Sequence, residues 1–155
     1  MGSFNFKSSG KTAEQKSIES ILKSATPIGI KTPLRFASGD GLYGMNYVLS
    51  DQVKDNLRNL IMTNWGERLG FYDFGGNLRS LTTEYVSQDD FDSKAIERIR
   101  TAVGRWMPYI DLEDFESRAN RTDNKNTAVI DIIITYNIPS LDVKQQKLQI
   151  TLYVI

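Results

Sequence analysis

The stretch Ala128–Tyr136, which reads AVIDIIITY, decides the fold class of this chain. Its side chains divide into two alternating sets. One face carries Ala128, Ile130, Ile132, Ile134 and Tyr136, and the other carries Val129, Asp131, Ile133 and Thr135. A period of two residues, with one face wholly apolar, is typical of a β-strand that buries that face in a core.

Two more strands lie on either side of this stretch in the sequence. The residues Leu148, Ile150, Leu152 and Val154 share one face of a predicted strand over Lys147–Ile155. Ile110–Ser117 is a mixed, acidic segment whose alternation breaks at Asp114, which predicts a bulged strand. Pro139 turns the chain between the last two strands.

Two amphipathic helices precede the strands. The first begins near Ser50, a favourable N-cap, and ends near Trp65. Its apolar face contains Val53, Leu57, Leu60 and Ile61. The second begins within Ser87–Asp92, where acidic residues suit the positive end of the helix dipole, and Pro108 stops it. Residues 66–79 contain four glycines and predict a compact loop or a short hairpin.

This order of elements predicts an α+β fold, with two amphipathic helices packed on one face of a three-stranded antiparallel sheet. The predicted domain spans residues 50–155 of the 155. Residues 1–49 read as an irregular N-terminal arm with a short helix near 13–23, because Gly, Ser, Thr and Pro recur there. Residues 1–35 hold six basic and two acidic residues, against 13 and 17 in the rest of the chain. We expect this mildly basic arm to lie on the protein's own body or on a partner.

The composition excludes several classes of function. There is no Cys and no His, so thiolate or histidine catalysis and the common zinc and haem sites are absent. Lys plus Arg and Asp plus Glu both total 19, which gives no basis for nucleic-acid binding. No apolar run approaches the length of a membrane-spanning helix. We therefore expect no cofactor, no metal, no nucleic acid, no membrane and no small-molecule ligand.

Carboxylates are the remaining candidates for acid–base chemistry. Glu67 and Asp73 flank a loop rich in Gly and aromatic residues, and a pair of carboxylates is what a glycosidase requires. The alternative is that Glu67 pairs with Arg68 or caps a turn. We predict no catalytic residue and keep the glycosidase as the alternative.

Basic residues gather on one stripe of the second helix, where Lys94, Arg98 and Arg105 follow a helical spacing. A solvated face is the expected interpretation. The remaining option is a docking surface for an acidic partner.

Three segments, in order along the chain, resemble one known family. Residues 63–68, TNWGER, are similar to its T-x-x-G-E/S-R turn after an amphipathic helix. Residues 71–78, FYDFGGNL, resemble its P-x-F-G-x-x-L loop, and residues 102–110, AVGRWMPYI, its A-[IV]-x-x-[WY]-E-P-R-[IL] segment. The family is the gene-product-twenty-five-like baseplate wedge family of contractile-tailed phages, related to TssE of type VI secretion. The resemblance covers residues 50–155.

The resemblance implies a structural, non-enzymatic subunit that bridges the core of the baseplate wedge to the first ring of the tail sheath. Its implied partners are other baseplate wedge proteins and the tail sheath protein, and its implied location is the tail baseplate of a virion assembled in the host cytoplasm. Family members are often labelled lysozymes, so the alternative is a tail-associated glycosidase that cleaves peptidoglycan. A stand-alone α+β binding domain is a third reading.

Two segments are predicted to contact partners. At the first, the family's Glu-Pro-Arg motif reads Met107-Pro108-Tyr109, so that an apolar or aromatic contact replaces an ionic one. Trp106, just before it, is expected to anchor the helix end in the core. The second is the end of the last strand, Leu152, Tyr153, Val154 and Ile155, which either lies inside its own sheet or pairs with another chain.

Overall fold

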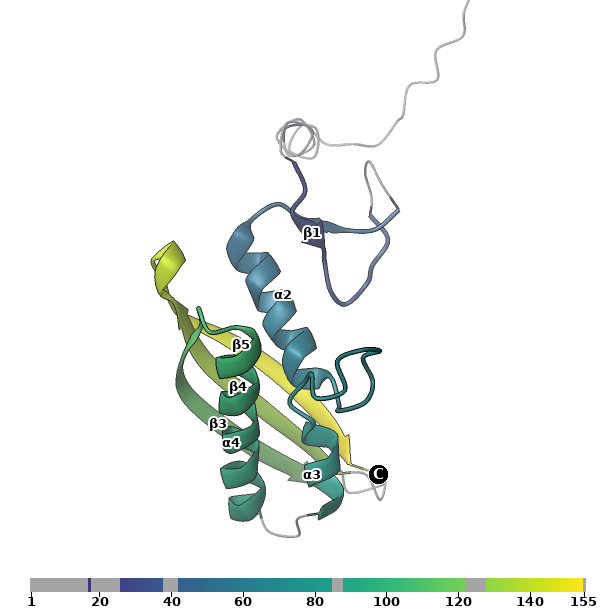
Figure 1. Ribbon diagram of the computed structural model, residues 1–155, viewed down its shortest axis with the longest axis vertical. Coiled ribbons are helices and arrows are strands. Elements are labelled where there is room, and N and C mark those ends of the chain that lie inside the picture. The colour runs from purple at the N-terminus through teal and green to yellow at the C-terminus, as the bar shows by residue number, and fades with distance from the viewer. Residues whose placement is uncertain (1–16, 18–25, 38–41, 85–87, 122–127, 155) are drawn as a thin grey trace, which may run out of the picture. The chain divides into compact units, whose positions relative to one another are not determined.

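The computed structural model describes residues 17, 26–37, 42–84, 88–121 and 128–154. The chain divides into two compact units, residues 1–52 and residues 53–155, which are described separately below. Figure 1 shows their elements. The predicted boundary between an arm and a domain, at residues 49 and 50, stays a prediction.

The first unit contains a small antiparallel sheet where the sequence predicts an irregular arm. Strands β1 (Gly29–Ile30) and β2 (Met45–Asn46) pair, and an isolated bridge joins Phe36 to Tyr43 further along the same hairpin. The rings of Phe36 and Tyr43 stack with their centroids 6.2 Å apart. The predicted helix near residues 13–23 lies outside the described residues apart from the helical Ser17.

The second unit is built on a three-stranded antiparallel sheet in the order β3-β4-β5 (Figure 1). These strands are β3 (Asp111–Arg121), β4 (Ala128–Ile138) and β5 (Val143–Val154). The β3–β4 register shifts between Leu112 and Asp114, at the predicted break. The strand β5 begins at Val143 instead of Lys147, because the 3₁₀ helix η1 (Pro139–Leu141) turns the chain tightly enough for pairing to resume at once.

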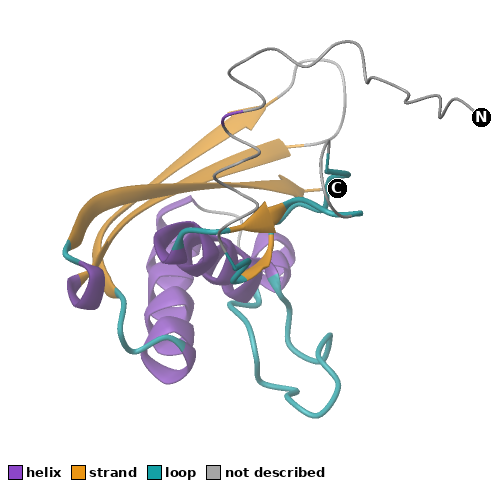
Figure 2. Ribbon diagram, turned by 90° about the horizontal axis from the view of Figure 1, so that it is seen from above, coloured by secondary structure: helices purple, strands orange, loops and turns teal. Residues whose placement is uncertain are grey.

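One face of the sheet carries the core, and Figure 2 shows the helices gathered on that face. On β4, Ile132, Ile134 and Tyr136 are buried there. The opposite face is partly exposed and polar in part. In its middle, Asp131 Oδ1 accepts a hydrogen bond of 2.7 Å from the hydroxyl of Thr151 on β5. The predicted α+β fold and the alternation in β4 are confirmed.

Three helices occupy the core side, one more than predicted: α2 (Leu49–Met62), α3 (Leu78–Glu84) and α4 (Gln88–Trp106). The helix α2 starts at Leu49, so Ser50 lies inside it and the predicted N-cap was wrong. It ends before Trp65, because Thr63 closes its last turn through Asn59: the Thr63 hydroxyl donates to the Asn59 carbonyl at 2.5 Å. Within the described ranges, no helix combines the length and apolar character that crossing a membrane requires.

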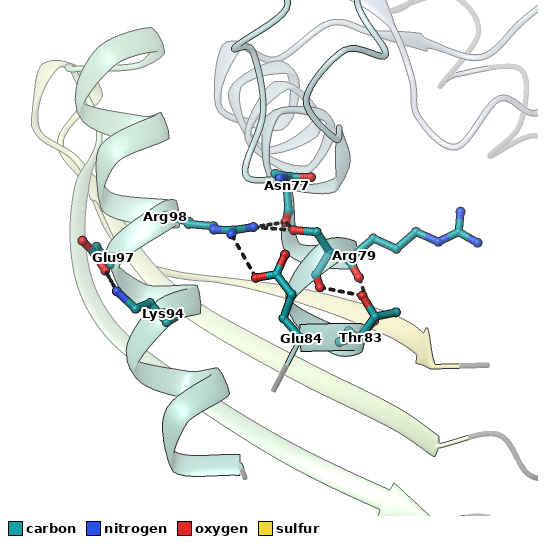
Figure 3. Close-up of polar contacts among 9 residues, drawn as sticks. Asn77, Arg79, Thr83, Glu84, Lys94, Glu97 and Arg98 are labelled. Atoms are coloured by element: carbon teal, nitrogen blue, oxygen red, sulfur yellow. Dashed lines mark hydrogen bonds and ion pairs between the residues drawn. The ribbon is translucent and has the colours of Figure 1, made fainter. Parts of the chain in front are cut away.

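The unpredicted helix α3 is held by Arg98, which the sequence placed on a solvated stripe of α4. Figure 3 shows the Arg98 guanidinium reaching across to α3. It donates to the carbonyl of Asn77 at 2.7 Å and to the hydroxyl of Ser80 at 2.6 Å, and it lies 3.7 Å from a carboxylate oxygen of Glu84. The solvated-face interpretation was therefore wrong for Arg98, although Lys94 is exposed and pairs with Glu97.

Candidate functional site

The loop of residues 63–77 folds back on the end of α2 and closes there through its own backbone. The N–H of Gly76 donates to Leu60 O at 3.0 Å, and the N–H of Asn77 donates to Thr63 O at 3.2 Å. Leu60 lies in the last turn of α2, whose carbonyls have no partners within the helix, and Thr63 follows the helix directly. Gly75 has a φ of +116°, and a Cβ there would overlap the Thr63 carbonyl oxygen. Glycine is therefore required where the loop meets the helix.

Aromatic rings fill the space between this loop and the end of α4. Phe71 and Phe74 meet the ring of Trp106 edge to face, with centroids 5.7 Å and 5.2 Å away. The Arg68 guanidinium lies over the Phe74 ring at 4.3 Å and over the Phe71 ring at 5.5 Å. Trp106 is only half-buried. It packs against the buried core as the sequence predicts, so its ring anchors the end of α4 at the rim of the core and also supports the loop.

An open groove of about 800 Å³ lies between α2, this loop and the segment after α4. We call it the aromatic groove. Its lining is Asn56, Asn59, Leu60 and Thr63 from the α2 side, Glu67, Arg68, Phe71 and Phe74 from the loop, and Trp106, Met107 and Tyr109 from the end of α4. A concave surface that mixes apolar and aromatic side chains with a few polar groups is typical of a binding site.

Of the predicted contact residues Met107, Pro108 and Tyr109, which form the corner after α4, Met107 and Tyr109 line this groove. Met107 is 5% exposed and lies at the floor, so it presents little surface of its own. Pro108 is exposed in the turn that follows α4. Tyr109 is 44% exposed, and its partial burial raises the pKa of the phenol above the ordinary value of 10.0. The phenol is therefore protonated at neutral pH and can donate a hydrogen bond to a partner.

The predicted terminal segment lies apart from the groove lining. The strand β5 is one edge of the three-stranded sheet and pairs with β4. Tyr153 is 65% exposed, whereas Leu152 is half-buried on the core side. Val154 is the last residue of β5 and pairs with Ala128, and Ile155 lies outside the described residues. No residue of this segment lines the groove.

The two candidate catalytic carboxylates are engaged in structural contacts. Glu67 caps a turn: its carboxylate accepts hydrogen bonds from the backbone N–H of Asn64 at 2.7 Å and from the side-chain amide of Asn64 at 2.8 Å. These bonds lower the pKa of Glu67 below its ordinary value of 4.5, whereas the general acid of a glycosidase needs a raised pKa. Asp73 pairs with Arg105.

Metal binding has no candidate in the described part of the chain, where no group of three or more acidic side chains is placed to hold an ion.

The residues that the sequence analysis missed as site residues are Arg68, Phe71 and Phe74. Their signal was present in the glycine-rich loop, in which aromatic residues recur shortly after Arg68. What the sequence could not indicate is that Trp106, far along the chain, packs against them.

Comparison with family models gives the class of protein. Residues 48–142, well over half of the chain, match the model described as baseplate wedge protein gp25. This range contains every residue of the aromatic groove and ends just before β5. The chain is thus a structural protein of a baseplate. It belongs to the gp25 baseplate wedge family, as the sequence motifs predict.

Solved structures with the same fold are distant in sequence. A chain of the anti-feeding prophage baseplate, seen by cryo-electron microscopy with sixfold symmetry, is 22% identical with a TM-score of 0.57, covering 75% of this chain and 87% of that one. A Geobacter sulfurreducens crystal structure, described as a candidate tail lysozyme, is 20% identical with a TM-score of 0.52, covering 70% and 93%. These likenesses show the fold alone. No curated protein matches the chain.

Proposed function

We propose that this protein is a non-enzymatic wedge subunit of a contractile phage tail that bridges the wedge core to the first ring of the tail sheath. Its partners are other baseplate wedge proteins and the sheath protein, and its location is the baseplate of the virion, after assembly in the host cytoplasm. The supporting observation is that β5 is an edge strand that shares no residue with the aromatic groove. One domain thus carries two separate surfaces, as a bridge requires.

The sheath side of the proposed bridge is the edge of β5. An edge strand carries N–H and C=O groups that its own sheet does not pair, and a strand from another chain can bind them. Tyr153, largely exposed near the end of β5, lies on the sheet face opposite the helices, beside Val129 in register. The proposed sheath contact runs along Leu152–Ile155.

The wedge side of the proposed bridge is the corner Met107-Pro108-Tyr109. Tyr109 takes the place of the Arg in the family motif, and its exposed ring offers a large apolar surface with one polar tip. Pro108 fixes the turn that presents the ring, and Met107 supports that turn from below. We propose that this corner packs on a neighbouring wedge protein.

The bridge is tested by recruiting purified sheath protein to the wedge with a Tyr153→Pro variant. Proline removes one N–H from the edge and blocks strand pairing, so recruitment falls while the melting temperature changes little. The matched control is Tyr153→Ala, which removes the side chain but leaves the backbone able to pair. Unfolding of the Tyr153→Pro variant would show that this segment is internal to its sheet and would overturn the edge assignment.

A non-enzymatic role is tested separately with purified cell walls. Because Glu67 is bonded as a carboxylate and Asp73 is paired with Arg105, we expect no clearing of a peptidoglycan suspension. The measurement compares the parent with Glu67→Gln. Clearing by the parent that the variant loses would establish the glycosidase and refute a purely structural role.

Residues 1–49 are the remaining part of the proposal, and much of that stretch lies outside the described residues. We propose that a partner covers them in the assembled baseplate. Limited proteolysis of the free protein and of the assembled wedge tests this. Equal cleavage of residues 1–49 in both states would exclude a partner contact.

A further inference from the structure

We propose that the aromatic groove binds an extended acidic segment of a neighbouring baseplate protein, with an apolar side chain of that segment in the groove and its adjacent carboxylate on Arg68. The proposal rests on the proposed wedge function and names the chemistry of one partner contact. It concerns a different set of residues from the β5 edge.

The cation of the groove is held in place by aromatic rings. Arg68 lies over both Phe71 and Phe74, and this stacking restricts a side chain that would otherwise be flexible. Arg68 is exposed, and no carboxylate among the described residues forms an ion pair with it. A guanidinium that is oriented in advance binds a carboxylate through two parallel hydrogen bonds with little further ordering.

The nearby carboxylates already have other partners. Glu67 directs both oxygens to Asn64, and Asp73 is paired with Arg105. Neither residue neutralises Arg68 through a direct contact. The groove therefore presents one cationic group beside an apolar surface, which is complementary to a single carboxylate next to an apolar side chain.

The floor and walls of the groove fit that apolar side chain. Leu60 and Met107 are buried beneath it, while Phe71 and Tyr109 remain about half exposed at its sides. Covering these rings removes apolar surface from water, and each square ångström buried contributes about 25 cal/mol. The volume of about 800 Å³ is sufficient for several side chains of a bound segment.

The polar wall favours an extended segment over a helix. Asn59 of α2 lines the groove with an exposed side chain. A side-chain amide offers a donor and an acceptor, which match the free N–H and C=O groups of an extended backbone. The interior of a helix has no such free groups, since its backbone is paired within itself.

The same charges disfavour a polyanion. A nucleic acid or an anionic membrane presents many negative groups and is bound by several cations together. Among the residues that line the groove, Arg68 is the one cation, and Glu67 adds a negative charge next to it in the sequence. One cation is sufficient for a single carboxylate, whereas a row of phosphates would find no second cation in this lining.

The test uses the full-length chain and two sets of acetylated hexapeptides, one with Phe-Glu and one with Phe-Gln at the centre of otherwise identical Gly and Ser residues. The readout is the fluorescence of Trp106 in a Trp65→Phe background, in which Trp106 is the one tryptophan left. We expect the Phe-Glu peptide to change this fluorescence and to bind at least fivefold more tightly than the Phe-Gln peptide. Arg68→Gln should remove the preference, and Arg68→Lys should keep part of it.

The matched control is Arg100→Gln, which removes the same charge from an exposed position of α4 outside the groove and should keep the preference. Equal binding of both peptides, or no response of Trp106, would overturn the proposal. Binding of a single-stranded oligonucleotide or of phosphatidylserine vesicles with the same dependence on Arg68 would also overturn it, in favour of a polyanion site. Thermal unfolding of each variant confirms that it is folded.

Sheath recruitment, measured on the same variants, separates the two proposals. Arg68→Gln should leave recruitment through β5 unchanged. If Arg68→Gln loses the preference for the Phe-Glu peptide but still recruits sheath, the groove acts independently of the β5 edge. If the parent binds the peptide normally but recruits no sheath, the bridging function is refuted and the groove proposal stands.

Discussion

The two candidate contact surfaces differ in which atoms do the binding. The β5 edge offers backbone groups in a regular row, and the identity of most side chains there matters little to strand pairing. The aromatic groove offers side chains from three segments, held by a loop whose closure depends on Gly75 and Gly76. Specificity for a partner should therefore lie mostly in the groove, and the edge should accept any suitable strand.

The largest expected effect comes from breaking the loop that builds the groove. Gly75→Ala forces a side chain into a backbone with a φ of +116° and against the Thr63 carbonyl. We expect a loss of about 3–4 kcal/mol in the free energy of unfolding, measured by urea denaturation. The control is Gly70→Ala, at a φ of +82° with open space around it, which should lose about 1 kcal/mol. Equal losses would mean that loop closure does not depend on the close approach at Gly75.

The next effect concerns the ring under the loop. Trp106→Ala removes the edge-to-face contacts with Phe71 and Phe74. Because Trp106 is half-buried, we expect about 2 kcal/mol of destabilisation, below the 3–5 kcal/mol typical of a fully buried Trp. Tyr72→Ala in the same loop, at a side chain that is largely exposed, should stay within about 0.5 kcal/mol of the parent. If Trp106→Ala instead lowers the free energy of unfolding by about the 3–5 kcal/mol typical of a buried Trp, the loop and the core unfold as one unit.

A direct comparison of the two surfaces pairs Tyr109→Ala with Tyr153→Ala. Both remove an exposed tyrosine ring. We expect Tyr109→Ala to weaken binding of wedge proteins about tenfold, or about 1.4 kcal/mol, with an unchanged melting temperature. Tyr153→Ala should change sheath recruitment by less than about twofold, since pairing there uses the backbone. Normal wedge assembly by Tyr109→Ala would show that Tyr109 only packs over its own turn and contacts no wedge protein.

The smallest effect is a pH dependence at the rim of the groove. The folded-state pKa of Glu67 lies below its unfolded value near 4.5, because Asn64 binds the carboxylate. The stabilisation is thus present above pH 4.5 and is lost as the pH falls through the folded-state pKa. We expect Glu67→Gln to be less stable than the parent by under about 0.5 kcal/mol at pH 7, because the site is exposed. The difference should close as the pH falls through the folded-state pKa. Glu113→Gln on β3 is the control for removing one negative charge. A stability difference between Glu67→Gln and the parent that persists in acid would exclude the Asn64 hydrogen bonds as its cause.

The strands were predictable from the sequence, whereas the position of β5 at the sheet edge was left open there and most of the groove was not predicted. Alternation over Ala128–Tyr136 and the last strand is a local signal, so the strands and their buried faces followed from it. The helix α3 was missed because its sequence, LRSLTTE, is short, and its support comes from Arg98 about twenty residues away. The groove depends in the same way on packing between residues as distant as Leu60 and Tyr109.

The arrangement of the sheet has a consequence for how the chain is made on the ribosome. The strand β4, with its run of isoleucines, leaves the ribosome before β5, so one of its edges is uncovered until the final strand arrives. Short apolar segments of high β-propensity are those that start aggregates, and a charge within them opposes this. Asp131 interrupts the isoleucine run, and once β5 is in place its carboxylate accepts a hydrogen bond from the Thr151 hydroxyl. The residue thus protects the nascent strand first and is built into the finished sheet afterwards.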